Sequence, residues 1–548
     1  MSSTRSLASK LVGQALAGLL IAPTGLTLSP GLAFAQSDVV VQSDDQPQAA
    51  VAADLTDTPE VQEQAEMSAD VDDEDAPTLD ATRTGKVRAL PSLTTSACPS
   101  TLQSQIDAAA AGSTVTPAVC IYRETVTISK PLTLRAAAGT EIRGSNIWTG
   151  WMPAGATWVS GASVPTFASE TGNPSYVDAF HATHPEQVFM DGRALTEVSS
   201  SPAAGQFALD SARHVVLGAD PTGHTVEVTV RDKWLLPTSD SVTVSGFVFK
   251  HAATAGQGWS IGNNNRSYFT LSNSTISDVH GSAVGLGGGD TYSSILNNTF
   301  TRIGDTAVTS YKDGHSIIRG NTIFGNGFGG WDWGWQAGGI KTASSTNLLV
   351  DQNVVYGNGG PGIWCDMACQ NVTISNNTVH DNTGPNIFFE ISVGASIFGN
   401  AVWHTTSGWP AIYISSSANA EVFQNIVAWS PRGIQVYEQN RPDKPVQGVV
   451  NVYVHDNTIV EGSGSSIAAF WGDYGNGGVT NPASNNHGAN NRYWYPIAED
   501  GETRFIWGSS GFSSLSAFAN TPAEQSGAYI STTQRDQILS AKGVPLTQ

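Results

Sequence analysis

A repeating pattern of polar and aliphatic positions dominates the chain between about residue 245 and residue 460. Asn followed by a small or branched residue and then an aliphatic one recurs at Asn273, Asn298, Asn321, Asn353, Asn377, Asn400, Asn425 and Asn457. The successive differences are 25, 23, 32, 24, 23, 25 and 32 residues. A unit near 24 residues with two insertions is typical of a solenoid.

Each unit contains short segments in which aliphatic and polar residues alternate, as in residues 372–374 and 412–414. A period of two residues indicates strands rather than helices. Leucine-rich repeats have a similar length, but their Leu spacing is missing here, and Ile, Val and Asn dominate instead. The pattern therefore predicts an all-β fold, a right-handed parallel β-helix in which Asn side chains stack at the turns.

The segments before and after the repeat have patterns of their own. Residues 102–111 (LQSQIDAAAA) predict a helix that caps the N-terminal end of the solenoid. Residues 145–240 interrupt the repeat, and their strand-like segments 187–193 and 225–230 predict an inserted small β-sandwich. The predicted divisions are a cap with the first coil (91–144), the insertion (145–240), the β-helix (241–500) and a C-terminal cap or tail (501–548).

Acidic residues are concentrated before this folded part. The chain has 26 Lys and Arg against 47 Asp and Glu, a formal net charge of −21, and residues 37–90 alone contribute −11 from 14 acids and three bases. Residues 36–90 lack aromatic residues and periodicity, which predicts an acidic disordered linker. The remaining charge disfavours nucleic acids and strongly anionic polysaccharides as partners, because both require basic clusters.

The first 35 residues have the organisation of a secretion signal. A basic start is followed by an apolar run from Leu11 to Leu28 and by Ala33-Phe34-Ala35, a small-x-small cleavage motif. The alternative is a membrane anchor, for which the run is short and interrupted by Pro. We therefore expect a secreted protein, extracellular or periplasmic, without stable membrane insertion.

Export favours disulfides for the four cysteines of the chain. Cys98 and Cys120 flank the predicted capping helix, and Cys365 and Cys369 are four residues apart, so these are the natural pairs. Free or metal-bound thiols are the alternative, but no His stands at ligand spacing beside either pair. No metal site is predicted from these residues.

Two carboxylates are predicted to lie together on one face of the solenoid. Aligning the units on their Ile places Gly362-Ile363-Trp364-Cys365-Asp366 beside Asn386-Ile387-Phe388-Phe389-Glu390. If Ile points inward, Asp366 and Glu390 point outward, one coil apart, with Lys341 one coil earlier. Adjacent strands are about 4.8 Å apart, close to the roughly 5–5.5 Å separation of the two carboxyl groups in retaining glycosidases. The alternative is a solvated pair without catalytic function.

The two insertions in the repeat flank this pair. The first, residues 325–339, contains Gly329-Gly330-Trp331-Asp332-Trp333-Gly334-Trp335, a composition that suggests a loop wall with faces for sugar rings. The second contains Arg432, Glu438, Arg441, Asp443 and Lys444 and is expected to form the opposite wall.

Three segments resemble secreted β-helix proteins of the pectate-lyase-like superfamily. They are Trp335-Gln336-Ala337-Gly338-Gly339-Ile340-Lys341, residues 359–366 and residues 384–392. Within that superfamily the chain is similar to the glycoside hydrolase family 120 β-xylosidases, which also carry a β-sandwich insertion. The resemblance covers roughly residues 95–460.

The resemblance implies that Asp366 is the nucleophile and Glu390 the acid/base. Related sequences often have Glu where Gln336 stands and His where Phe389 stands. The substrate-binding residues expected for a glycan are Lys341, Trp331, Trp333, Trp335, Gln336 and Trp364, and no cofactor is expected.

Two other functions are compatible with the sequence. A polysaccharide lyase on the same fold would use Lys341 or an Arg as base, and Asp332, Asp351, Asp366 and Glu390 could supply oxygens to Ca²⁺. A non-catalytic glycan-binding solenoid of the cell surface is the third possibility. The preferred interpretation is a secreted, retaining glycoside hydrolase acting on an oligo- or polysaccharide, and the sequence does not indicate the oligomeric state.

Overall fold

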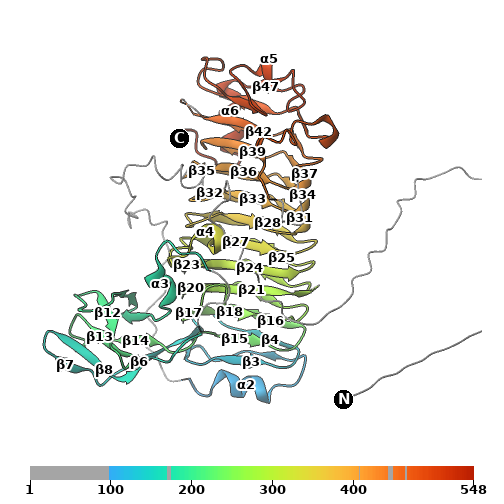
Figure 1. The fold of residues 1–548 in the computed structure, drawn as a ribbon. Helices are drawn as coiled ribbons and strands as arrows, with labels where there is room; N and C mark the ends of the chain where they lie inside the picture. The colour runs from blue at the N-terminus through green and yellow to red at the C-terminus, as the bar shows by residue number, and fades with distance from the viewer. Residues whose placement is uncertain are drawn as a thin grey trace, which may run out of the picture. The chain divides into compact units, whose positions relative to one another are not determined.

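The computed structural model describes residues 98–168, 174–263, 265–289, 291–406, 408–441, 448–462, 464 and 466–548. The predicted signal (1–35) and acidic linker (36–90) lie outside these residues. All described residues belong to one compact unit, residues 54–548. Within it, three long sheets of parallel strands form a solenoid, which confirms the predicted parallel β-helix (Figure 1).

Each coil of the solenoid contributes one strand to each of the three sheets, so strand numbers within a sheet advance mostly in steps of three. Sheet 1 consists of β1 (Thr114–Val115), β4 (Leu132–Arg135), β16 (Val242–Ser245), β19 (Thr270–Ser272), β22 (Ser294–Leu296), β25 (Ile317–Arg319), β28 (Leu349–Asp351), β31 (Gln370–Ser375), β34 (Val393–Phe398), β37 (Ala418–Phe423), β40 (Tyr453–His455) and β43 (His487–Ala489).

Sheet 2 consists of β2 (Ile121–Tyr122), β5 (Glu141–Arg143), β17 (Val248–Ala252), β20 (Thr275–Val279), β23 (Thr299–Ile303), β26 (Thr322–Phe324), β29 (Val354–Tyr356), β32 (Thr378–Asn382), β35 (Ala401–Thr405), β38 (Ile426–Ala428), β41 (Thr458–Val460), β44 (Arg492–Trp494) and β47 (Ala528–Tyr529).

Sheet 3 consists of β3 (Val126–Ile128), β15 (Leu235–Pro237), β18 (Trp259–Gly262), β21 (Ser282–Gly289), β24 (Thr306–Asp313), β27 (Gly338–Ala343), β30 (Ile363–Cys365), β33 (Ile387–Glu390), β36 (Pro410–Ser415), β39 (Arg432–Glu438), β42 (Ile467–Asp473), β45 (Phe505–Trp507) and β46 (Ser510–Phe512). β46 is antiparallel to β45.

Aliphatic side chains stack in the interior of the solenoid from coil to coil. In sheet 3, Ile340 pairs with Ile363, Ile363 with Ile387, and Ile387 with Ile412. All four are buried in the same hydrophobic core. Because side chains alternate across a strand, the residues on either side of each Ile point out of the solenoid.

The Asn residues form a buried ladder at one turn. Asn353 illustrates the pattern, since its Nδ2 donates to the Asn377 Oδ1 (3.0 Å) and to the Ile318 carbonyl (2.9 Å), while its Oδ1 accepts from the Asn321 backbone (3.0 Å). The ladder continues to Asn491, which accepts from the Asn457 backbone.

The predicted first member of the ladder, Asn273, lies one residue too early. Ser274 occupies the ladder position, where its backbone N–H donates to the Asn298 Oδ1 (3.0 Å). Asn273 instead adopts a left-handed conformation with φ of 52° at the preceding turn position. Asn tolerates that conformation. Asn273 therefore matches the sequence spacing of the repeat although its side chain is not part of the ladder.

The N-terminal end is covered by α2 (Leu102–Ala108), within the predicted helix. Leu102 and Ile106 are buried, and Glu124 accepts hydrogen bonds from the Leu102 N–H (2.7 Å) and the Gln103 N–H (3.0 Å) at the helix start. A disulfide joins Cys98 to Cys120, the pairing expected from the sequence.

The insertion contains two sheets that enclose their own hydrophobic core. One sheet comprises β6 (Ser145–Trp148), β9 (Val188–Met190), β10 (Arg193–Ala194) and β14 (Val226–Thr229), and the other β7 (Met152–Ala154), β8 (Thr157–Ser163), β11 (Thr196–Glu197), β12 (Gln206–Leu209) and β13 (His214–Leu217). The core includes Phe207, Leu217 and Val226. The solenoid resumes at β15, before the predicted boundary at residue 241, because β15 pairs with β3.

A buried ion-pair network ties the insertion to the first coil. Glu227 on β14 contacts Arg123 (2.6 Å) and Arg143 (2.7 Å), which both belong to the solenoid. Burial alone would raise the pKa of Glu227, but the opposing charges, Arg143 first, lower it to about 2. The carboxylate therefore stays ionised at the junction.

The C-terminal coil extends past the predicted boundary at residue 500, since β45 pairs with β42. It is followed by α5 (Leu515–Phe518) and α6 (Thr532–Ala541), and a short 3₁₀ helix, η2 (Pro482–Ser484), precedes it. Leu539 of α6 packs in a cluster with Trp403 and Trp429 of sheet 2. Within the described residues, no helix is long and apolar enough to cross a membrane.

Candidate active site

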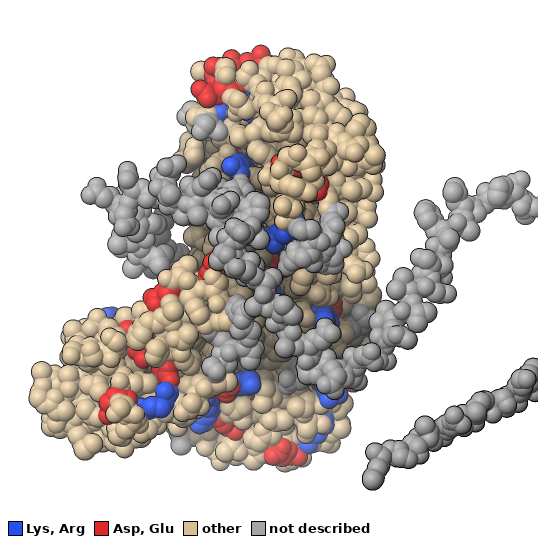
Figure 2. Space-filling view, in the orientation of Figure 1, with Lys and Arg blue, Asp and Glu red and all other residues tan. Residues whose placement is uncertain are grey.

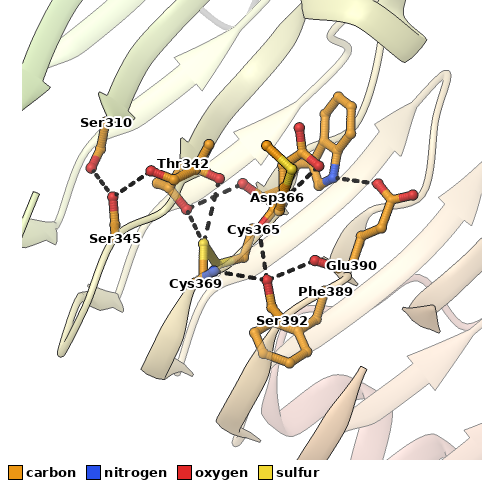
Figure 3. The surroundings of a disulfide bond; sticks show 12 residues. Ser310, Thr342, Ser345, Cys365, Asp366, Cys369, Phe389, Glu390 and Ser392 are labelled. Atoms are coloured by element: carbon orange, nitrogen blue, oxygen red, sulfur yellow. Dashed lines mark hydrogen bonds between the residues drawn. A yellow bond between two sulfur atoms is a disulfide. The ribbon is translucent and has the colours of Figure 1, made fainter. Parts of the chain in front are cut away.

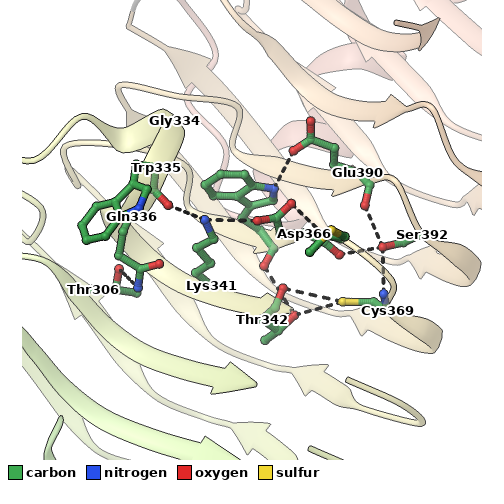
Figure 4. Close-up of polar contacts among 12 residues, drawn as sticks. Thr306, Gly334, Trp335, Gln336, Lys341, Thr342, Asp366, Cys369, Glu390 and Ser392 are labelled. Carbon is green, nitrogen blue, oxygen red and sulfur yellow. Dashed lines mark hydrogen bonds and ion pairs between the residues drawn. The ribbon is translucent and has the colours of Figure 1, made fainter. Parts of the chain in front are cut away.

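The outward face of sheet 3 brings the predicted site residues together. In the strand register, Lys341 pairs with Trp364 and Trp364 pairs with Phe388. Asp366 directly follows β30, and Glu390 is the last residue of β33. Asp366 stands two residues after the outward-pointing Trp364, and Glu390 two residues after Phe388. Because side chains alternate along a strand, both carboxylates lie on the same outward face. Figure 4 shows Asp366 and Glu390 on this face, with Lys341 beside Asp366.

Asp366 is the more accessible carboxylate, with 22% of its side chain exposed. Its Oδ2 lies 3.2 Å from the Lys341 Nζ, and its Oδ1 accepts from the Met367 backbone N–H (2.6 Å). The Lys341 Nζ also donates to the Trp335 carbonyl (2.6 Å) and lies 3.6 Å from the centroid of the Trp364 ring. The ammonium group therefore connects the carboxylate, the indole and the Trp loop.

Glu390 is almost covered, with 3% of its side chain exposed. Each carboxylate oxygen has its own donor: Oε2 accepts from the Trp364 indole Nε1 (3.2 Å), and Oε1 lies 2.6 Å from a guanidinium nitrogen of Arg441. Arg441 comes from the second insertion in the repeat, just after β39. The sequence placed Arg441 in a wall of the site but did not predict this ion pair.

Aromatic rings form a stacked row beside the carboxylates. Trp364 stacks on Phe388 (centroids 5.4 Å apart), and Phe388 stacks on Tyr413 (4.9 Å). Trp333 meets Trp364 (6.4 Å) and Trp409 (5.1 Å) edge to face. The Trp364 ring is thus in contact with both the Phe388 ring and the Lys341 ammonium. Trp333 and Trp335 are partly exposed.

The Trp loop contains α4 (Trp333–Gln336). Asp332 caps this short helix by accepting from the Gly334 N–H (2.9 Å). Gln336 is buried, and its Nε2 donates to the Thr306 Oγ1 (3.2 Å). These contacts fix the loop at both ends of α4. The carbonyl of Trp335, just before Gln336, accepts the hydrogen bond from Lys341.

A second disulfide lies directly beneath the two carboxylates (Figure 3). Cys365 is joined to Cys369, the second pairing expected from the sequence. The Ser392 Oγ accepts from the Cys369 N–H (3.0 Å) and lies within hydrogen-bonding distance of the carbonyl oxygens of Asp366 (2.7 Å) and Glu390 (2.6 Å). One hydroxyl thus connects the backbone of both candidate catalytic residues.

Sequence and structure comparisons agree on the architecture. Residues 259–443 match the family model described as "Right handed beta helix region". The solved structure of XylC with xylose superposes with a TM-score of 0.58 at 17% identity, covering 75% of this chain and 83% of XylC. The protein is a right-handed parallel β-helix. Among curated proteins, none matches the sequence.

Two further β-helix similarities are more distant. The A-module of mannuronan C-5 epimerase AlgE6 from Azotobacter vinelandii has a TM-score of 0.40 at 11% identity, with 78% of this chain and 94% of that module covered. A structure named glycoside hydrolase has a TM-score of 0.30 at 11% identity, with 79% of this chain and 90% of the other covered.

The structure buries two of the predicted sugar platforms, Trp331 and Trp364, whereas Trp333 and Trp335 are partly exposed. Trp331 is only 3% exposed, and its ring lies edge to face against His280, with centroids 5.0 Å apart. Its backbone forms a bridge with Tyr176 of the insertion. The Trp331 ring therefore contacts protein, whereas the Trp333 ring meets Trp364 and Trp409 in the site.

Phe389 and Gln336 have different surroundings. Phe389 points into the solenoid, between Cys365 and Ile414 in the strand register. Gln336 faces Thr306, which in turn donates to the Asp305 carboxylate (3.0 Å). Burial raises the pKa of Asp305 to about 6, although hydrogen bonds from Ser282 and the Gln257 backbone oppose that rise.

The four oxygen donors considered for Ca²⁺ do not form one site. Asp351 lies on sheet 1, where it binds Arg319 (2.8 Å), while Asp366 and Glu390 lie on sheet 3. Asp332 caps α4. Across the described parts of the chain, no group of three or more His, Cys, Asp or Glu side chains could hold a metal ion. Asp443 and Lys444 of the second insertion lie outside those parts.

A separate cavity of about 500 Å³ lies in the insertion, lined by residues such as Met190, Arg193 and His224. It contains none of the predicted site residues. Figure 2 shows that acidic and basic side chains are interspersed on the visible face rather than gathered into a patch of one sign.

Proposed function

We propose that this protein is a secreted carbohydrate-active enzyme, a glycoside hydrolase that retains anomeric configuration, with Asp366 as nucleophile and Glu390 as acid/base. The observation that carries the proposal is the pair of outward carboxylates on neighbouring strands, with Asp366 held by Lys341 and Glu390 held by the Trp364 indole and Arg441. The spacing of adjacent strands, about 4.8 Å, suits the roughly 5–5.5 Å separation used in retention.

In the first step, an Asp366 oxygen bonds to the anomeric carbon while the glycosidic bond breaks and Glu390 transfers its proton to the leaving oxygen. In the second step, Glu390 takes a proton from water, the water oxygen bonds to the anomeric carbon, and the bond to Asp366 breaks. Each step inverts the configuration at the anomeric carbon, so after two steps the original configuration is retained. This role requires the Glu390 carboxyl to become accessible when a glycan binds.

The charges around the two acids favour a neutral glycan. Lys341 pairs with Asp366 and Arg441 pairs with Glu390, so the formal charges of these four groups cancel. A lyase would need a base and a cation for the uronate, yet both of these basic groups already contact carboxylates. The proposed sugar contacts are the partly exposed Trp333 and Trp335, with Lys341 beside the Trp364 indole, whereas Gln336 and Trp364 are themselves buried. The XylC structure, which shares the fold, was solved with xylose.

Secretion fits the disulfide between Cys98 and Cys120, because such bonds persist in oxidising compartments. The substrate proposed here is an oligo- or polysaccharide outside the cytosol.

The test is to incubate the full chain with a panel of aryl glycosides and neutral polysaccharides. Released aglycone, new reducing ends and the anomer of the first product are measured, together with the absorbance of unsaturated sugars. Asp366→Asn and Glu390→Gln are each expected to lower kcat at least ~100-fold, while Asp351→Asn on sheet 1 retains activity.

Four results would contradict the proposal. Unsaturated products would indicate a lyase, and an inverted first product would exclude Asp366 as nucleophile. Glycan binding without turnover would indicate the non-catalytic solenoid. Wild-type rates in either active-site variant would remove that residue from the reaction.

A further inference from the structure

Arg441 holds the Glu390 carboxylate from the second insertion in the repeat. A guanidinium nitrogen lies 2.6 Å from the Glu390 Oε1, and 17% of the Arg441 side chain is exposed. The Arg441 Nε donates to the Gln439 Oε1 (2.8 Å), and the Gln439 backbone N–H donates to the Ser416 Oγ (2.9 Å). The arginine is thus fixed to the coil that follows Glu390.

This contact opposes the first of the two tasks of an acid/base residue. A cation within hydrogen-bonding distance favours the ionised form of a carboxyl group, and so does a hydrogen bond donated to it. Glu390 receives both, from Arg441 and from the Trp364 indole. Cleavage requires the protonated form, whereas the hydrolysis of the glycosyl-enzyme requires the ionised form.

We infer that Arg441 is a positioning residue that orients Glu390 and sets the upper pH limit of the reaction. This inference rests on the proposed function. In the first step, Arg441 restricts proton donation to lower pH. In the second step, it keeps the carboxylate ready to accept a proton from water.

Other titratable groups on this face, among the described residues, lie on neighbouring coils. Lys341 and Asp366 precede Glu390, and Tyr413 and Tyr437 follow it in the aromatic cluster of Trp364. Lys341 lies over the Trp364 ring and contacts Asp366 (3.2 Å). Removing Arg441 therefore changes the charge beside Glu390 and leaves the ion pair of Asp366 in place.

The experiment compares kcat/KM against pH for the wild type, Arg441→Gln and Arg441→Lys, using an aryl glycoside that the wild type cleaves. Neutralising a close opposite charge shifts a carboxyl titration by about 1–3 pH units. In Arg441→Gln, the alkaline limb is expected to move upward by at least ~1 pH unit while the acidic limb stays. Arg441→Lys keeps the charge, so its limb should remain close to that of the wild type.

Arg319→Gln is the matched control, because it removes a comparable arginine–carboxylate pair from sheet 1, 2.8 Å from Asp351. Its pH profile should match the wild type even if its melting temperature falls. A purely structural role for Arg441 would likewise lower stability without moving one limb of the profile.

An unmoved alkaline limb in folded Arg441→Gln would overturn the inference, as would an equal upward shift in Arg441→Lys. If Arg441→Gln does not fold, Gln439→Ala replaces it, since that change removes the partner of the Arg441 Nε. A smaller upward shift supports the inference, and no shift overturns it.

The two proposals fail in distinguishable ways. An active Glu390→Gln variant, or a wild type without glycosidase activity, would reject the proposed function, and the role of Arg441 would fall with it. An active wild type and an inactive Glu390→Gln variant, together with an unmoved limb in Arg441→Gln, would reject only the role of Arg441.

Discussion

The Asn ladder should be the most sensitive stabilising element of the solenoid, and Asn353→Ala tests it. Asn353 is 1% exposed. Its side chain accepts from the backbone and side-chain N–H groups of Asn321 (3.0 Å each) and donates to the Ile318 carbonyl (2.9 Å) and the Asn377 Oδ1 (3.0 Å). Alanine removes all four contacts and leaves the Asn321 backbone N–H without this acceptor.

The expected loss follows from these contacts. A hydrogen bond contributes about 1 kcal/mol net, so four of them correspond to about 4 kcal/mol, before any added cost for buried groups left unpaired. Asn353→Asp should not rescue the ladder, because the carboxylate would face the Ile318 carbonyl and the Asn377 Oδ1 instead of donating to them.

The measurement is urea unfolding of the full chain followed by circular dichroism. Asn419→Gly is the control, because Asn419 is exposed on β37 with φ of 56°, a conformation that Gly adopts readily, and the change removes only the exposed hydrogen bond from the Asn451 Nδ2 (3.0 Å). It should change stability by less than about 1 kcal/mol. An Asn353→Ala variant as stable as Asn419→Gly would refute the reasoning.

Two further changes test other parts of the structure. The pKa of Asp305 rises from 3.8 to about 6 on folding, so the folded form binds the proton more tightly. The contribution of Asp305 to stability should therefore fall by about 3 kcal/mol as the pH rises from about 4 to above 6. Thermal melts of Asp305→Asn should lack this fall. A variant with the same pH dependence as the wild type would contradict the prediction. The disulfide between Cys98 and Cys120 closes a separation of 22 residues, so Cys98→Ser with Cys120→Ser should cost about 3 kcal/mol in urea unfolding. Opening the four-residue separation of Cys365 and Cys369 should cost less, and a larger loss there would contradict the loop-entropy argument.

Much of the fold could be predicted because the repeat fixes the register. The Ile ladder is visible in the sequence, and alternation along each strand then places Trp364 and Asp366 outward. The same reasoning could not separate Asn273 from the true ladder position at Ser274, since Asn is favoured both as a ladder residue and at a left-handed turn position. The predicted β-helix bounds at residues 241 and 500 also differ from the structure, since β15 and β45 belong to the solenoid and lie outside the run of Asn residues that marks the repeat.

The contacts that tune the site could not be predicted from the repeat. Arg441 and Trp331 both lie in insertions, where the periodic alignment is lost, and the direction of a side chain there depends on tertiary packing. Arg441 turns onto Glu390 (2.6 Å), whereas Trp331 turns away, against His280. The only signal for the contact between Arg441 and Glu390 was a charged residue in an insertion expected to flank a predicted acid. No signal indicated the contact between Trp331 and His280.

The β-sandwich insertion contributes directly to the order of the site. The backbone N–H groups of Val177 and Asp178 donate to the Gly330 carbonyl (3.0 and 2.9 Å), and Gly330 has a φ of 96° with the Asp178 carbonyl where a Cβ would be. Only glycine suits that contact. Because Gly330 leads into α4, and the Trp335 carbonyl of α4 holds Lys341, the insertion fixes the loop that positions the partner of Asp366. The solenoid supplies the two carboxylates, and a segment outside the repeat determines the surroundings of one of them.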